Sequence, residues 1–418
     1  MTDDQQVSRR RLLATAGVAG AAGLATGAGA NSGAHVLAST SQNSGTHPPL
    51  TALGTDSVPF FGTHQPGIVE PMQARMYATA FDLTAGTARP GLISLLKRWS
   101  AAAAAMAEGR SPQGLADDVA LDAGPCSLTV TFGFGASLFA KTGLSAQLPQ
   151  ALAPLPAFPE DALDRRRSDG DLWVQVCADD ALVTFAAMRA LQRLAAGAAA
   201  VRWQMSGFSR SPGATAQPRT GRNLMGQIDG TNNPKPSDAG FDARVFVPAK
   251  GSGDPAWMAG GSYAVFRRIR MLLDSWDQQP KERQERVIGR RKTSGAPMSG
   301  GTEGTAVDLE RQNPDGSPAV PGDAHIRVAA PASNQGAAML RRGYSYHDGL
   351  RPDGSPDAGL LFVAFQSDPL TGFVPVQRKL SRGDALSRFI AHESSGLYAV
   401  PPGATAPGGY VGRPLLES

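Results

Sequence analysis

An acid, an imidazole and a guanidinium are the side chains of this sequence with the clearest chemical potential. Asp229 lies in GQIDGTNNP, residues 226–234, where Gly230 and two asparagines favour a tight turn. His325 begins HIRVAAP, and its apolar neighbours predict that the imidazole is partly buried. Arg341 follows sixteen residues later in LRRGYSY, and a buried guanidinium needs an anionic partner. Each also has an ordinary structural interpretation: a solvated turn, a hydrogen-bonded core histidine and a structural ion pair.

Several common catalytic and metal-binding motifs are missing from the sequence. It contains no HExxH, no GxSxG, no GxxxxGK[ST] and no GxGxxG between a strand and a helix. These absences argue against a zinc protease, a serine hydrolase, a P-loop protein and a dinucleotide-binding protein. Cys126 and Cys177 are the two cysteines, and their apolar surroundings favour buried free thiols, with a disulfide left open. Acids are interspersed through a chain of net charge +4, so nucleic acid is not an expected partner.

The N-terminus predicts export. Residues 1–30 begin polar, place Arg9 and Arg10 before a weakly apolar Ala/Gly/Leu stretch and end in small residues, which is typical of a twin-arginine signal peptide. An ordinary secretory signal is the alternative. The expected destination is the periplasm, the cell envelope or the extracellular space. Because the twin-arginine route carries folded proteins, often with a cofactor in place, it raises the expectation of a cofactor. Residues 31–57 are polar and are interpreted as a disordered leader.

Hydrophobic patterning predicts an order of strands and helices that occurs twice. Alternating apolar runs predict strands, and apolar residues at i, i+3, i+4 and i+7 predict helices. The first half is expected to contain strands 75–83, 127–134 and 172–177, a helix from Pro90, and a helix from Asp179-Asp180 to Leu194. The second half is expected to contain strands 262–271 and 360–365, a strand-like or extended 325–330, a helix 281–291, and a helix opened by Asp368-Pro369.

Corresponding elements of the two halves are separated by nearly the same number of residues. Tyr77 and Tyr263 are 186 residues apart, and Asp179 and Asp368 are 189 apart. We therefore predict an α+β fold of two related units, each with an antiparallel sheet faced by helices. A Ser/Pro/Gly-rich stretch at 209–221 is the expected junction.

Taken together, these segments resemble the dye-decolorizing (DyP-type) peroxidases. GQIDGTNNP, GGSYAVFRRIRM, ERVIGRRKTSGAPMSG, HIRVAAP, LRRGYSY and FVPVQRKL carry the likeness in the second half, and FGTHQPGI and DLWVQVCADD carry it in the first. The closest subgroup is the exported one that includes the deferrochelatase/peroxidase of iron-uptake systems. The resemblance covers residues 58 to about 410. It implies two ferredoxin-like domains, expected at 58–212 and 213–418, with haem b in the C-terminal domain.

The resemblance also implies roles for the three residues introduced above. His325 would be the proximal ligand of the haem iron, with Asp384 as the expected hydrogen-bond partner of its second nitrogen and Asp368 as the second choice. Asp229 and Arg341 would form the distal pair. The carboxylate would move a proton between the peroxide oxygens, and the guanidinium would stabilise the charge on the departing oxygen.

Two short segments are expected to contact the haem on the same grounds. They are Gly230, Thr231 and Asn232 after the distal acid, and Ala330, Pro331 and Ala332 after the proximal ligand. The family often has a basic residue where this chain has Ala332, which places one propionate contact in doubt.

Several further residues have two interpretations that the sequence does not separate. Arg267, Arg268 and Arg270 alternate along a strand, so one face could serve a propionate or the face could simply be solvated. Arg342 is expected to pair on the surface. Phe362 either packs over the distal side of the haem or belongs to the core. His64 and His392 are expected to make structural hydrogen bonds, and His347 to lie in a polar loop. Six side chains are candidates for electron transfer or, more simply, core aromatics: Trp173, Trp203, Trp257, Trp276, Tyr344 and Tyr346.

The function expected from the resemblance is a haem b peroxidase that reduces H2O2 and oxidises dyes, phenolics or other reductants. Two alternatives use the same pocket. One is a deferrochelatase, which releases iron from haem and leaves the porphyrin intact in an iron-acquisition system. The other is a non-catalytic haem carrier. Expected partners are H2O2, an organic or metal-linked reductant and, for the first alternative, iron-uptake components; homo-oligomer formation is left open. No membrane span is expected in the mature chain.

Overall fold

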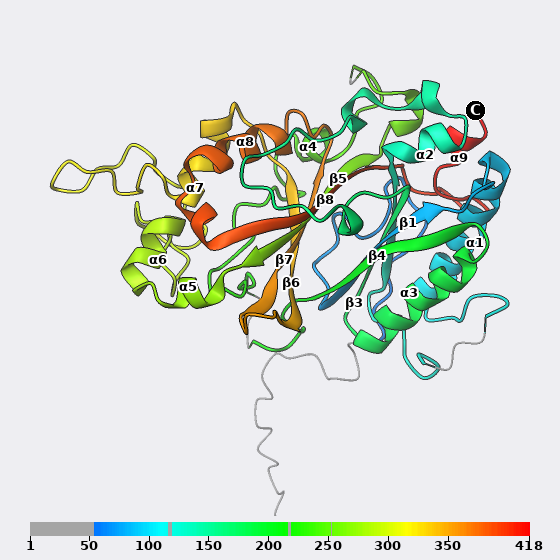
Figure 1. Ribbon diagram of the computed structural model, residues 1–418, viewed down its shortest axis with the longest axis horizontal. Coiled ribbons are helices and arrows are strands. Elements are labelled where there is room, and N and C mark those ends of the chain that lie inside the picture. Colours follow the sequence, from blue (N-terminus) through cyan, green and yellow to red (C-terminus); the bar gives the residue numbers. More distant parts are fainter. Residues whose placement is uncertain (1–53, 116–118, 216–218, 252) are drawn as a thin grey trace, which may run out of the picture. The chain divides into compact units, whose positions relative to one another are not determined.

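Eight antiparallel strands close into a barrel in the computed structural model, which describes residues 54–115, 119–215, 219–251 and 253–418. Around the barrel the strands follow the order β1-β3-β2-β8-β5-β7-β6-β4 (Figure 1). Their bounds are β1 Arg75–Leu83, β2 Thr129–Gly135, β3 Leu172–Ala178, β4 Ala199–Phe208, β5 Ser262–Met271, β6 Leu340–Leu350, β7 Pro356–Gln366 and β8 Ile390–Val400. The expected signal peptide and nearly all of the expected leader lie outside the described residues.

Each half of the chain supplies four neighbouring strands of the barrel. The strands β1–β4 of the first half pair with one another, as do β5–β8 of the second. The two sets are joined where Phe134 of β2 pairs with Ala399 of β8 and where Phe208 of β4 pairs with Ser345 of β6. The prediction of an α+β fold with two antiparallel, ferredoxin-like halves is confirmed. The sequence did not show that the two sheets close on each other.

Aromatic side chains from both halves fill the inside of the barrel. Trp173 stacks on Tyr398 with ring centroids 5.5 Å apart, and Trp203 stacks on Phe266 at 4.9 Å. Residues that alternate along the strands point into this cluster, and burying each large ring contributes about 1.5–3 kcal/mol to folding. All six aromatic residues that were candidates for electron transfer are buried: Trp173, Trp203, Trp257, Trp276, Tyr344 and Tyr346.

Helices cover the outer faces of the two halves differently. Figure 1 shows α1 (Arg89–Ala107) and α3 (Ala181–Ala195) together beside the strands of the first half. As predicted, Pro90 lies in the first turn of α1, and the Asp180 carboxylate caps α3 by accepting the N–H groups of Leu182 and Val183. The second half carries α5 (Leu273–Asp277), α6 (Lys281–Ile288), α7 (His325–Val328) and α8 (Phe373–Gly383); the short helices α2 (Ala136–Lys141), α4 (Phe241–Val245) and α9 (Arg413–Leu416) complete the set among the described residues.

Two of the predicted elements were wrong. The segment 325–330 was expected to be strand-like, but it forms the helical turn α7, in which the Ala324 carbonyl accepts the N–H groups of Arg327 and Val328. Asp368 was expected to open a helix, but its carboxylate closes a turn by accepting the Leu370 N–H. The helix α8 begins five residues later, where Pro375 lies in the first turn and its missing N–H costs no hydrogen bond.

Three strands were missed because their patterns are weak in the sequence. In β4 and β6, buried residues alternate with charged or small ones, and β8 contains two serines and a glycine. Their pairing with distant strands determines their conformation, and that pairing is not a local signal. Cys126 and Cys177 are buried and unpaired, as predicted. Among the described residues, no helix has both the length and the apolar character that a membrane span requires.

Candidate functional site

A cavity of about 410 Å³ lies on the outer face of the second half of the barrel. Its walls come from β5, β6, β7 and β8, from α7 and α8, and from the segment 223–232, and most of the lining residues are apolar. All nine residues predicted for the site line this one cavity: Asp229, Gly230, Thr231, Asn232, His325, Ala330, Pro331, Ala332 and Arg341. The fold therefore brings together three segments that are far apart in the sequence.

His325 is held on one wall of the cavity by a carboxylate. It is the first residue of α7, and its Nδ1 donates to Asp384 Oδ2 at 2.6 Å. The other carboxylate oxygen of Asp384 accepts the Leu386 N–H at 2.9 Å, which fixes the acid at the end of α8. The predicted partner is thus confirmed, and the second choice, Asp368, is not used. With Nδ1 engaged, the Nε2 lone pair is left for a ligand.

The environment of His325 combines burial with a negative charge. Burial by itself lowers the pKa of His325, but the charge of Asp384 and its hydrogen bond outweigh burial and raise the pKa above its ordinary value. The side chain of Asp384 is 2% exposed, so water screens the pair weakly. A neutral imidazole in this arrangement is a strengthened electron donor.

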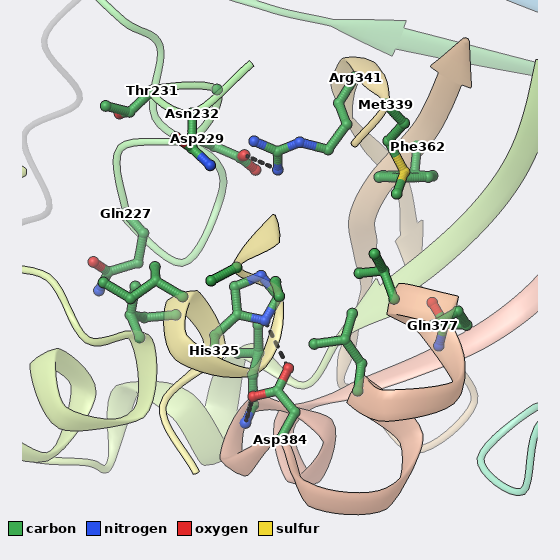
Figure 2. A pocket seen from close by; sticks show the side chains of 18 of the residues that line it. Gln227, Asp229, Thr231, Asn232, His325, Met339, Arg341, Phe362, Gln377 and Asp384 are labelled. Atoms are coloured by element: carbon green, nitrogen blue, oxygen red, sulfur yellow. Dashed lines mark hydrogen bonds and ion pairs between the residues drawn. The ribbon is translucent and has the colours of Figure 1, made fainter. Parts of the chain in front are cut away.

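Asp229 and Arg341 face His325 from the opposite side of the cavity (Figure 2). Arg341 Nη1 lies 3.4 Å from Asp229 Oδ1, and both side chains remain about one-third exposed. Asn233 fixes the arginine, since its Oδ1 accepts the Arg341 N–H and Nε–H at 3.2 Å each, while its Nδ2 donates to the Arg341 carbonyl at 2.7 Å. Sequence reasoning missed Asn233, although it lies four residues after Asp229 in the same turn.

The turn around Asp229 has the expected construction. Gly230 adopts φ +108°, a conformation that L side chains rarely reach, so the chain turns sharply after the acid. Before it, Asn223 Nδ2 donates to Asp229 Oδ2 at 3.3 Å. After it, the Thr231 hydroxyl donates to Glu303 Oε1 at 3.1 Å, which ties the turn to the loop that follows α6. Asp229 is thus half-buried, between a donor and an ion-pair partner.

The interpretation of the β5 arginines as a solvated face was wrong. Arg267 is 1% exposed, lines the cavity, lies over the edge-to-face pair of rings of Phe158 and Phe373, and pairs with Asp161. Because β5 alternates, Arg268 points to the other face. There it is fully buried and pairs with three acids: Asp348, Asp357 and Glu393. Arg270 pairs with Glu393.

Arg342 was expected at the surface, and this too was wrong. It is 4% exposed and donates to the Glu70 carbonyl and to Gln73 Oε1 of the first half of the chain. Since β6 alternates, Arg341 faces the cavity and Arg342 faces the barrel. Arg341 therefore belongs to the wall of the cavity, whereas Arg342 connects β6 to the first half of the chain.

The remaining predicted residues are placed as follows. His64 Nδ1 donates to the Gly260 carbonyl at 2.7 Å, and buried His392 lies 3.4 Å from Gln377 Nε2, so both make the structural contacts expected of them. Burial, together with the charge of Arg267, lowers the pKa of His392 to about 3. His347 is exposed, but at the end of β6 rather than in a loop. Phe362 lines the cavity beside Met339 (Figure 2).

The cavity fits a flat apolar macrocycle with a metal at its centre. Aliphatic and aromatic residues form most of the wall, one imidazole offers its Nε2, and the opposite wall carries a carboxylate and a guanidinium. Neutral imidazole is a normal axial ligand of haem iron. Haem therefore agrees with the residues that are present.

Comparison with known proteins agrees with this assignment. The family model described as Dyp-type peroxidase, N-terminal, matches residues 65–209, and the model described as Dyp-type peroxidase, C-terminal, matches residues 220–405. The chain belongs to the Dyp-type peroxidase family, so it is a haem enzyme with peroxidase activity.

Three relatives illustrate the range of the likeness. The chain is 46% identical to a dye-decolorizing peroxidase of Thermobifida fusca over 84% of each chain. It is 36% identical to a deferrochelatase of Yersinia pestis, over 100% of this chain and 97% of the relative. The solved structure of ferric DtpA from Streptomyces lividans superposes with a TM-score of 0.86 at 61% identity, covering 89% of this chain and 100% of that one.

Replacing Asp384 by Asn tests the coupling on the His325 side. Asn keeps an oxygen for the Leu386 N–H but removes the charge, so burial dominates and the pKa of His325 in the haem-free protein should fall. An NMR titration of the imidazole C–H signal measures the change. Asp368→Asn, in which the altered carboxyl group caps a separate turn, is the matched control. An unchanged titration in Asp384→Asn would contradict the coupling.

Proposed function

We propose that this chain reduces hydrogen peroxide at a haem held between His325 on one side and the Asp229–Arg341 pair on the other. The observation that carries the proposal is the placement of these three side chains on facing walls of one cavity. Haem supplies a redox-active iron that binds peroxide and stores its oxidising equivalents. The protein has to hold the cofactor, move one proton and stabilise one developing negative charge.

Asp229 moves the proton. Its carboxylate is an acceptor within the cavity, so it takes the proton from the oxygen of peroxide that remains behind and returns it to the oxygen that departs. Arg341 stabilises the negative charge on the departing oxygen, because guanidinium keeps its charge at every working pH. The three hydrogen bonds from Asn233 hold Arg341 in place before the reaction begins, so little reorganisation is needed.

His325 binds the haem iron through Nε2, with Asp384 strengthening it as a donor. Gly230, Thr231 and Asn232 on one segment, and Ala330, Pro331 and Ala332 on another, contact the cofactor. Ala332 offers no cation for a propionate, and Arg267 is already paired with Asp161. Arg267 Nε and Nη1 nevertheless have no hydrogen-bond partner among the described residues, so Arg267, together with backbone amides of these segments, is left to bind the propionates.

The reductants we propose are dyes, phenolics or other organic or metal-linked donors. Support comes from the relative named a dye-decolorizing peroxidase. We also propose that the chain is exported by the twin-arginine route, on the basis of the paired Arg9 and Arg10. A separate proposal is that its partners include iron-uptake components. Size-exclusion chromatography of the exported protein would decide whether it forms a homo-oligomer.

Removing either member of the distal pair should slow the reaction with peroxide. Asp229→Ala removes the proton acceptor and Arg341→Ala removes the stabilising charge, so each should lower the second-order rate constant with H2O2 by about 10²-fold or more. Stopped-flow measurement of the Soret band reports the rate. Wild-type rate constants in Asp229→Ala would argue against Asp229 as the proton carrier.

Replacing His325 by Ala should remove the protein's ligand to iron. The purified variant is expected to contain little haem, or haem with a changed Soret spectrum. Haem content by pyridine haemochrome and a visible spectrum measure this. His64→Ala, at a histidine hydrogen-bonded away from the cavity, is the control. Normal haem content and a normal spectrum in His325→Ala would reject the ligand assignment.

A second candidate function is the release of iron from haem with the porphyrin intact. Support comes from the likeness to a deferrochelatase along the full length of this chain. Product analysis separates the two functions: oxidised dye with haem retained supports the peroxidase, and metal-free porphyrin, seen by its fluorescence, supports the deferrochelatase. We expect oxidised dye to be the main product in the presence of H2O2.

A further inference from the structure

Asn223 contacts the carboxylate of Asp229 from inside the cavity. It lies six residues before the acid, lines the same cavity and is half-buried. Its Nδ2 donates to Asp229 Oδ2 at 3.3 Å, while Arg341 Nη1 lies 3.4 Å from Asp229 Oδ1. Each oxygen of the carboxylate therefore has its own side-chain partner.

The backbone determines which way the Asn223 amide points. Its Oδ1 accepts the N–H groups of Met225 at 3.1 Å and Gln227 at 3.3 Å. These two donors can pair only with the amide oxygen, so the NH2 group has to lie on the side of Asp229. The backbone of Asn223 also exchanges hydrogen bonds with Gly226 and Gln227, which closes the turn that leads to the acid.

We propose that Asn223 is a positioning residue that fixes the rotation of the Asp229 carboxylate for proton transfer. The inference rests on the proposed function, because it assumes that Asp229 carries the proton. A carboxylate on a half-exposed turn rotates freely unless both oxygens are held, and misplacing an acid–base group by about 1 Å can cost about 10²-fold in rate. Asn223 and Arg341 hold it from two sides, and Asn223 adds no charge of its own.

Asn223→Asp separates the two tasks of this residue. Asp keeps oxygens for the Met225 and Gln227 N–H groups, so the turn is preserved, but it has no donor for Asp229 and brings a second carboxylate beside the first. Two carboxylates that share a site retain a proton to higher pH. The rate constant with H2O2 should therefore fall about tenfold or more, and the acid limb of its pH profile should move to higher pH.

The other ionisable groups around Asp229 stay the same in this variant. Arg341 pairs with it from β6, His325 faces it from α7, Arg290 lines the same cavity after α6, and Glu303 is bonded to the neighbouring Thr231. A shift of the pH profile between wild type and variant therefore reports the added carboxylate.

A second variant and a second measurement keep the outcome interpretable. Asn223→Ser keeps a hydroxyl that can accept from the turn, removes the Nδ2 group that reaches Asp229 and adds no charge, so it should slow the reaction without moving the pH profile. Cyanide binding to the haem-loaded protein gives a readout apart from turnover, because hydrogen cyanide must lose its proton to bind as the anion. Its association rate should fall in both variants, while the KM for the dye stays unchanged.

The controls distinguish this inference from the function on which it rests. Asn313→Asp adds the same charge at an exposed turn and should behave as wild type. If Asp229→Ala is slow but Asn223→Asp keeps the wild-type rate and pH profile, the positioning role is rejected and the proposed function stands. If Asp229→Ala is also unaffected, both are rejected. If both Asn223 variants lose haem or thermal stability in proportion to rate, Asn223 is only structural and the inference fails.

Discussion

The ion pair between Asp229 and Arg341 is the constraint around which the site is organised. The two residues are 112 positions apart in the chain, yet their side chains come within 3.4 Å in one cavity. A guanidinium there needs a counter-charge, and an acid there needs donors. The turn after Asn223, the sharp bend at Gly230 and the hydrogen bonds of Asn233 all help to bring these two groups together.

The opposite wall of the cavity also pairs a carboxylate with a basic side chain, which here is an imidazole. His325 on α7 and Asp384 at the end of α8 form a second acid–base pair at 2.6 Å. In this pair the carboxylate is almost completely buried and the imidazole faces the cavity, whereas Asp229 itself faces the cavity on the distal side. In the proposed mechanism, one carboxylate acts on a neighbouring side chain and the other acts on peroxide. Both residues are aspartates, so the difference between their roles comes from how deeply each carboxylate is buried.

Local sequence predicted the parts of this site that local geometry controls. A turn rich in Gly and Asn holds Asp229 as expected, and the capped helix α3 and the proline-started helix α1 follow from their first residues. Alternation predicted that Arg267 and Arg268 point to opposite faces. It could not tell that both faces are buried, because Asp161, which pairs with Arg267, and the acids that pair with Arg268 lie at least 80 positions away in the chain.

Other features were out of reach for a related reason. Asn223 and Asn233 look like ordinary turn residues, and their importance comes from Asp229 and from a strand that approaches from far along the chain. The turn α7 is too short for a helical period to develop, so a run of apolar residues was mistaken for a strand.

The way the barrel closes determines where the two halves of the chain can separate transiently. Strands within each half pair along most of their length. Among the described residues, β4 meets β6 only at Phe208 and Ser345, and β2 meets β8 only at Phe134 and Gly135. These sparsely bonded seams are where transient opening should be least costly and where amide protons should exchange with solvent soonest. The residues that line the cavity all belong to the second half of the chain, between Asn223 and His392. The two halves of the barrel can therefore move relative to each other without displacing the residues that hold the cofactor.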